Sequence, residues 1–177
     1  MILRSIVFFY LAMLPLVAAA QEQIVVNDPS IQFSYEKPAG WEVKDNGYTY
    51  QVHAPEVEGA FISFTYLQRP QGDEYVESLG DKPAFKEDFE FELLYNVADG
   101  VEGFEATERG KIKIDGTTAL WAKFSSLVNG EEMTNYFFMF PKLGQNFKIT
   151  TTAPKEDAET IQGDFEEIIS TFHAEKR

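Results

Sequence analysis

Histidine is the side chain best suited to proton transfer or metal binding near neutral pH, and this 177-residue chain contains only two. His53 alternates with Thr49 and Gln51, which predicts a position on the polar face of a strand. His173 comes at the end of the last predicted helix, where a cation suits the negative end of the helix dipole. A metal centre or a catalytic triad needs several convergent groups. We interpret both histidines as surface residues and expect no catalytic residue, no metal site and no cofactor.

Nucleophiles and phosphate-binding loops give no stronger signal. Ser125 and Ser126 lie within a predicted strand, without the Gly-x-Ser-x-Gly turn that exposes a catalytic serine. Residues 99–103 form a glycine-containing turn that lacks the strand-to-helix context of a phosphate loop. The absence of cysteine excludes thiol catalysis, cysteine metal sites and lipid attachment at an N-terminal cysteine. Carboxylates are abundant, so a hydrolase that uses carboxylates, with His53 as a participant, stays as an alternative.

Two loops contain side chains that recognise ions or partners in other proteins. Asp73, Glu74 and Asp81 are candidate calcium ligands, but they lack the regular oxygen spacing of a calcium loop, and we interpret them as solvated carboxylates. Arg69 lies in a loop that contains proline and glycine, where recognition residues often occur. Because arginine is rare in this chain, Arg69 is our candidate partner-binding residue.

The chain is strongly acidic, with 29 acidic and 15 basic residues and a net charge of −14. Such a surface repels phosphate backbones and anionic membranes. It favours basic partners and divalent cations. We therefore expect a protein or a small ligand as the partner, and neither nucleic acid nor a membrane.

The first twenty residues have the features of a secretory signal peptide. Arg4 is their only charge, an apolar run follows over residues 6–17, and the next three alanines are the small residues that a signal peptidase reads. The run is shorter than the ~20 apolar residues of a membrane span. We predict cleavage after Ala20, which leaves Gln21 at the start of a soluble, monomeric protein that is secreted or resides in a bacterial periplasm.

Beyond the signal peptide, we predict a flexible lead-in at residues 21–30 and one domain at residues 31–173. Asn46-Gly47, Asp115-Gly116 and Asn129-Gly130 are typical of hairpin turns, and we expect a bulge near Arg109-Gly110. Period-two alternation predicts strands over residues 31–35, 48–53, 60–67, 104–114, 117–128, 132–140 and 147–151.

Two segments change to a helical period. Residues 83–97 place Phe85 and Phe89 on one face, with Asp81 as the expected N-cap. The last helix has Pro154 in its first turn. Its apolar stripe consists of Ile161, Phe165, Ile168, Ile169 and Phe172. Residues 136–140 are apolar at consecutive positions, which is typical of a strand covered on both faces. These patterns predict an α+β fold with a central antiparallel sheet of six to seven strands sandwiched between helices.

The aromatic residues allow two interpretations. Exposed rings would form a stacking platform for sugars or bases, whereas alternation along strands is typical of a packed sheet core. We interpret the rings as core, with Trp41 after a glycine turn and Trp121 in the middle of a strand as anchors.

Several segments together resemble one known family. Phe-Ser-Tyr-x-x-Pro-x-Gly-Trp (33–41) opens the domain, and Asn-Tyr-Phe-Phe (135–138) forms an aromatic strand. Phe-Lys-Ile-Thr-Thr-Thr-Ala-Pro (147–154) then leads into a helix that ends Ile-Ile-Ser-Thr-Phe (168–172). Over residues 31–172 the chain is similar to the PsbP-like superfamily, which includes the extrinsic oxygen-evolving protein of photosystem II, a Ran-binding nuclear-import factor and many exported bacterial proteins. The resemblance implies an α/β/α fold and a binding or assembly role.

We therefore expect an exported, non-catalytic binding or assembly module. A carrier of a small apolar ligand is an alternative, which needs an apolar cavity of a few hundred Å³ between sheet and helix. The carboxylate hydrolase is a further alternative, which needs His53 close to two carboxylates in a cleft.

Overall fold

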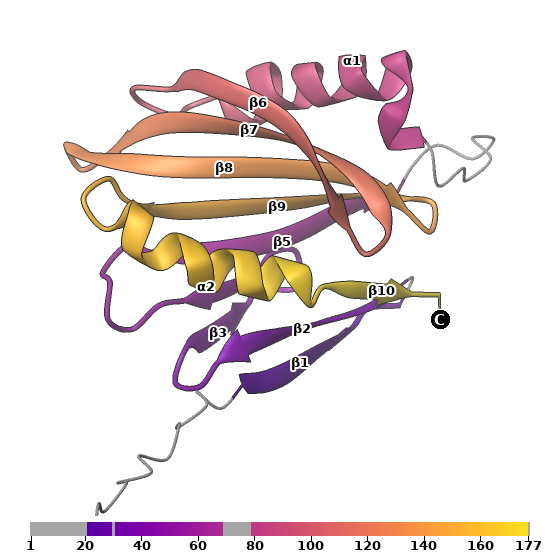
Figure 1. The fold of residues 1–177 in the computed structure, drawn as a ribbon, viewed down its shortest axis with the longest axis horizontal. Coiled ribbons are helices and arrows are strands. Elements are labelled where there is room, and N and C mark those ends of the chain that lie inside the picture. Colours follow the sequence, from indigo (N-terminus) through magenta and orange to yellow (C-terminus); the bar gives the residue numbers. More distant parts are fainter. Residues whose placement is uncertain (1–20, 30, 69–78, 177) are drawn as a thin grey trace, which may run out of the picture.

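A seven-stranded antiparallel sheet forms the centre of the computed structural model, which describes residues 21–29, 31–68 and 79–176 (Figure 1). In spatial order its strands are β3 (Glu42–Asp45), β4 (Tyr50–His53), β5 (Phe61–Gln68), β9 (Gln145–Pro154), β8 (Glu131–Lys142), β7 (Thr117–Val128) and β6 (Glu105–Ile114). The predicted antiparallel sheet is confirmed, and the fold is a sheet-dominated α+β fold.

The predicted hairpin turns explain the order of the last strands. Asp115 and Asn129 have φ angles of 46° and 55°, and the glycine after each also has a positive φ. Two-residue hairpin turns need this backbone, and here they connect β6 to β7 and β7 to β8. The predicted bulge is displaced, because the β6–β7 register shifts between Ala106 and Glu108 instead of near Gly110.

A second sheet has three strands in the order β1, β2 and β10, with the bounds Gln21–Asn27, Gln32–Pro38 and His173–Glu175. The predicted flexible lead-in is therefore wrong for residues 21–27, which pair with β2 along its whole length. Their polar composition concealed the strand, since Val26 alone among them is buried and backbone pairing holds the rest. β10 pairs with the other edge of β2.

Helical segments come between β5 and β6 in the sequence, and the last helix comes between β9 of the large sheet and β10 of the small one. In chain order they are η1 (Leu79–Asp81, a 3-10 turn), α1 (Pro83–Phe91), η2 (Glu92–Val97, a π-helical turn) and α2 (Ala158–Ser170). In the part of the chain that the structure describes, no helix is both long and apolar enough to cross a membrane.

α1 begins at Pro83, as predicted, but the residues predicted to cap or begin the two helices have other positions. Asp81 is not an N-cap; it lies in η1 and accepts hydrogen bonds from Lys111 and Thr118 on the sheet. Pro154 is the last residue of β9 and not part of α2. Each residue interacts with the large sheet instead: Asp81 through hydrogen bonds, and Pro154 as part of a strand.

Each face of the large sheet has its own core. On one face, α2 and the three-stranded sheet pack together (Figure 1). On the other face, α1 packs over β6–β8 through Phe85 and Phe89. Phe138 belongs to the first core and Phe137 to the second, which explains the doubly apolar run in β8. The cover of the sheet is therefore not a pair of helices alone, since β1, β2 and β10 contribute to one side.

Candidate binding groove

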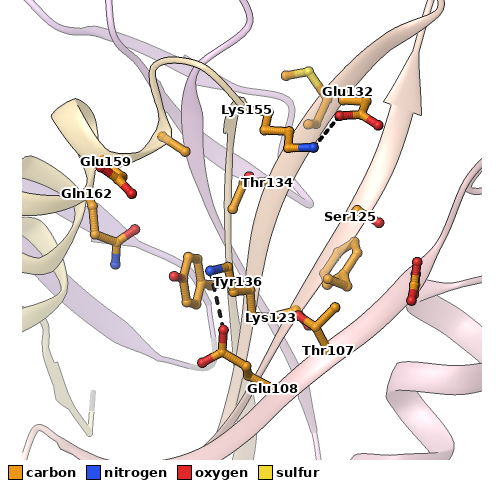
Figure 2. Close-up of a pocket in the computed structure, with 14 residues that line it drawn as sticks. Thr107, Glu108, Lys123, Ser125, Glu132, Thr134, Tyr136, Lys155, Glu159 and Gln162 are labelled. Atoms are coloured by element: carbon orange, nitrogen blue, oxygen red, sulfur yellow. Dashed lines mark hydrogen bonds and ion pairs between the residues drawn. The ribbon is translucent and has the colours of Figure 1, made fainter.

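A groove runs between α2 and the strands β6, β7 and β8, and we call it the α2 groove. It consists of two hollows of about 670 and 400 Å³ that share Tyr136 and Gln162. Figure 2 shows the larger hollow, with Glu159 and Gln162 on the α2 side, Glu108 on the opposite side, and Tyr136 and Lys123 between them. The smaller hollow is lined by Ile112, Lys113, Trp121, Tyr136, Phe138, Gln162, Glu166, Ile169 and Ser170.

The floor of the α2 groove follows from strand alternation on β7 and β8. Every second residue of a strand points to the same face. The register places Trp121 opposite Phe138, Lys123 opposite Tyr136, and Ser125 opposite Thr134. The floor therefore changes from aromatic at one end to hydroxyl-bearing at the other.

Gly110 makes room for the tryptophan of this floor. It pairs with Trp121 across β6 and β7, and a Cβ atom at position 110 would lie 2.7 Å from three atoms of the indole ring. The Trp121 and Tyr136 ring centroids are 6.0 Å apart, and Tyr136 stacks on Phe138 at 6.3 Å. Trp121 packs against the first core, as interpreted, but its side chain is only half-buried and also lines the groove.

A lysine crosses the middle of the floor. Lys123 Nζ lies 5.7 Å from the centre of the Tyr136 ring and 3.4 Å from Glu108 Oε1. Tyr136 is the largest cause of a raised pKa at Lys123, and the Glu108 carboxylate adds to it. Lys123 therefore stays charged at neutral pH and is already paired within the groove.

The remaining charges of the α2 groove are mostly carboxylates. Glu132 pairs with Lys155, and Glu166 accepts a hydrogen bond from Gln162. Glu105 and Glu159 line the larger hollow and have no ion pair among the described residues. The groove therefore presents carboxylate oxygens that are free to accept hydrogen bonds from a cationic ligand.

The histidines lie away from this groove and from each other. His53 is on β4, where its ring stacks on Phe61 at 5.2 Å and its Nε2 lies 3.1 Å from Gln51 Oε1. Burial is the main cause that lowers the pKa of His53, and Lys44 lowers it further. His173 is not a helix cap; it lies on β10, with Nδ1 2.9 Å from Asp115 Oδ1.

The other predicted site residues have separate outcomes. Arg69, Asp73 and Glu74 lie outside the described residues, as does Ala20, whereas Gln21 is the first residue of β1. Ser125 lines the α2 groove and donates a hydrogen bond to the Gly103 carbonyl oxygen. Residues 21–29, 31–68 and 79–176 contain no group of three or more His, Asp or Glu residues arranged to hold a metal ion.

Solved structures with the same fold have low sequence identity to this chain. The solution structure of cyanobacterial PsbP (CyanoP) from Synechocystis sp. PCC 6803 matches with a TM-score of 0.64 and 14% identity, over 91% of this chain and 96% of that one. LpqN, involved in cell envelope biogenesis of Mycobacterium tuberculosis, matches with a TM-score of 0.56 and 13% identity, over 87% and 91% of the two chains.

A eukaryotic protein also has this fold. The Saccharomyces cerevisiae Ran-binding protein Mog1p matches with a TM-score of 0.53 and 12% identity, over 88% of this chain and 96% of that one. No protein-family model matches the chain, and no curated protein sequence matches it. The fold is PsbP-like, as the sequence resemblance indicated.

Proposed function

We propose that the chain is an exported, non-catalytic binding or assembly module and that the α2 groove is its binding site. One observation carries the proposal: the rings of Trp121 and Tyr136 are only partly buried against the first core, and both line the same groove. Aromatic rings with one wet side are enriched in recognition sites. The description of Mog1p as a Ran-binding protein agrees with a binding role, and the involvement of LpqN in cell envelope biogenesis agrees with export.

Export is part of the same proposal. The described part of β1 begins at Gln21, so cleavage after Ala20 would remove none of the described residues of this strand. Intact mass of the secreted or periplasmic protein should correspond to a chain that begins at Gln21. A membrane-bound product that retains residues 1–20 would contradict this part of the proposal.

The surroundings of His53 give the hydrolase alternative no support. That alternative needs two carboxylates in a cleft, whereas His53 has the single carboxylate residue Glu42 opposite it across β3 and β4 and otherwise contacts Gln51 and Phe61. We expect His53→Ala to keep both the fold and the native phenotype. A folded His53→Ala variant without function would favour the hydrolase. Arg69 remains a proposed partner contact, tested by the loss of partner capture in Arg69→Glu.

Site-specific photo-crosslinking in the native host tests the binding site. Thr134 lines the α2 groove, and Ser63 is a half-buried hydroxyl residue on the opposite face of the same sheet. A photo-reactive phenylalanine analogue at position 134 should give a discrete crosslinked product that Trp121→Ala weakens. The same analogue at position 63 is the matched control. Equal products at both positions, or a product insensitive to Trp121→Ala, would reject the groove as the site.

The small-ligand carrier is the second candidate, and the smaller hollow favours it. That hollow lies between sheet and helix, as the alternative requires, and its volume of about 400 Å³ is that of a small-molecule site. Its aromatic and aliphatic lining would hold an apolar molecule. Binding of an uncharged naphthalene dye, measured as enhanced fluorescence, would support this candidate if Trp121→Ala abolishes the binding.

A further inference from the structure

The length of the α2 groove favours an extended, chain-like ligand over a small molecule. Its larger hollow reaches Ala158 at the start of α2, and its smaller hollow reaches Ser170 at the end. A rise of 1.5 Å per residue along these 12 helix steps gives roughly 18 Å. An extended peptide advances about 3.3 Å per residue, so roughly five to six residues span the groove. A small ligand would occupy one of the two hollows and leave the other empty.

The smaller hollow is built for one apolar side chain. The rings of Trp121, Tyr136 and Phe138 form its floor, and Ile112 and Ile169 close its sides. An aromatic side chain buries roughly 150–250 Å² and gains further from edge or offset contacts with other rings. This end of the groove therefore selects an aromatic or large aliphatic anchor.

The charged side chains of the groove determine which ligand charge, positive or negative, is favoured. Glu105 and Glu159 line the larger hollow without a described ion-pair partner, and Glu166 stands beside the smaller one. Of the lysines that line the groove, Lys123 and Lys155 are paired with Glu108 and Glu132, and Lys113 donates a hydrogen bond to Thr118. The chain as a whole has a net charge of −14, which attracts cations and repels anions.

Resting on the proposed function, we propose that the α2 groove binds an extended peptide segment of a partner protein. The segment has about six residues, one aromatic or large aliphatic anchor, and lysine or arginine side chains within a few positions of it. The anchor lies against Trp121, and the basic side chains pair with Glu159 and Glu105. Groove length, ring lining and charge complementarity each contribute one part of this description.

Titration of isotope-labelled protein, beginning at Gln21, with three blocked hexapeptides tests the inference by NMR. The first peptide contains one phenylalanine and three lysines; the second replaces each lysine by glutamate; the third replaces the phenylalanine by alanine. The first should shift the amide signals of Trp121, Tyr136 and Gln162. The second and third should each bind at least about tenfold more weakly, since charge and anchor both contribute.

Two charge-reversal variants form a matched pair. Glu159→Lys lies in the groove, whereas Glu87→Lys makes the same change on an exposed position of α1, over the other face of the sheet. Glu159→Lys should weaken the lysine peptide several-fold, and Glu87→Lys should leave its affinity unchanged. Equal weakening in both would mean that net charge alone acts, which would overturn a specific pairing.

The outcomes separate this inference from the proposed function. No signal changes with the lysine peptide at about 1 mM, or no preference for lysine over glutamate, overturns the peptide inference. If the position-134 crosslink still depends on Trp121, the groove remains the binding site and its ligand has another chemistry. Binding of the uncharged dye alone assigns the site to a small apolar molecule. Loss of the crosslink result rejects the groove itself, and with it both proposals.

Discussion

At the scale of single residues, the pair Gly110 and Trp121 shapes the candidate site. Gly110 has no side chain, and the indole of Trp121 occupies the space where a Cβ atom would stand. The ring is thereby held over the backbone of β6 with one side open to the α2 groove. A change at position 110 should therefore alter the groove without touching any ligand directly.

We predict that Gly110→Ala displaces the Trp121 ring while the fold persists. The added Cβ would lie 2.7 Å from ring atoms, and a side chain can move where a backbone could not. Overpacking of this kind costs about 1–3 kcal/mol of unfolding free energy. In a Trp41→Phe background, the emission of Trp121 should shift relative to the same background with glycine at position 110. An unchanged spectrum would contradict the packing of Trp121 on Gly110.

Sequence reasoning could find the strands of the site but not the site. The alternation of Trp121, Lys123 and Ser125 on one strand, and of Thr134 and Tyr136 on the next, was readable as a shared face. The pairing of these two rows depends on the β7–β8 register, and the groove depends on where α2 lies. The strand register and the position of α2 both depend on contacts between residues far apart in the sequence. The same local pattern therefore fits an aromatic ring in the core and one on the surface.

At the scale of elements, α2 is both a wall of the groove and a cover for the core. Its buried stripe faces the large sheet and the three-stranded sheet together. Phe165 is 1% exposed and meets the edge of Trp41, with ring centroids 5.9 Å apart. The next residue, Glu166, lines the smaller hollow of the α2 groove. Adjacent residues of one helix thus serve stability and recognition separately.

We predict that Phe165→Ala lowers the free energy of unfolding by ~3–5 kcal/mol, because it leaves a cavity under α2. Glu166→Ala, one residue away and exposed, should change the same quantity by no more than ~0.5 kcal/mol. Chemical denaturation of both variants measures the difference. Equal, small effects would mean that α2 does not dock through this stripe.

The prediction of elements from the sequence was correct where it depended on local features, such as turn dipeptides and helical periodicity. Asp115-Gly116 and Asn129-Gly130 form the expected hairpins, and the stripe of α2 is buried as its period indicated. The prediction of a flexible lead-in was wrong because residues 21–27 form the polar strand β1. Backbone pairing with β2, the next strand in the sequence, holds β1 in place. The π-helical turn after Phe91 also had no local signal, since residues 83–97 keep one helical period.

At the scale of the whole molecule, Asp115 connects the two sheets. It lies in the turn between β6 and β7 of the large sheet, and its carboxylate reaches β10 of the small one. The Ala174 backbone N–H donates to Oδ2 at 3.0 Å, and His173 Nδ1 lies 2.9 Å from Oδ1. Lys142 Nζ of β8 lies 3.1 Å from Oδ2. One side chain therefore couples the C-terminal strand to the central sheet.

This coupling predicts a stability that depends on acid. Burial raises the pKa of the Asp115 carboxyl because it disfavours the charged form. The hydrogen bonds from the Ala174 N–H, His173 and Lys142 lower the pKa by more, so it lies below its usual 3.8. A group whose pKa is lower in the folded state stabilises the fold fully above its unfolded pKa. That contribution is lost as the pH falls through the folded value.

Urea unfolding of the wild type and of Asp115→Asn measures this contribution. Asparagine also adopts the positive φ of the turn, so the variant removes charge and leaves the backbone unstrained. At about pH 7 the variant should be the less stable protein, and the gap between the two should narrow steadily below about pH 4. Asp99→Asn, at an exposed turn position, is the control and should show no gap at either pH. A gap for Asp115→Asn that stays constant across this range would mean that the carboxylate charge does not hold the two sheets together.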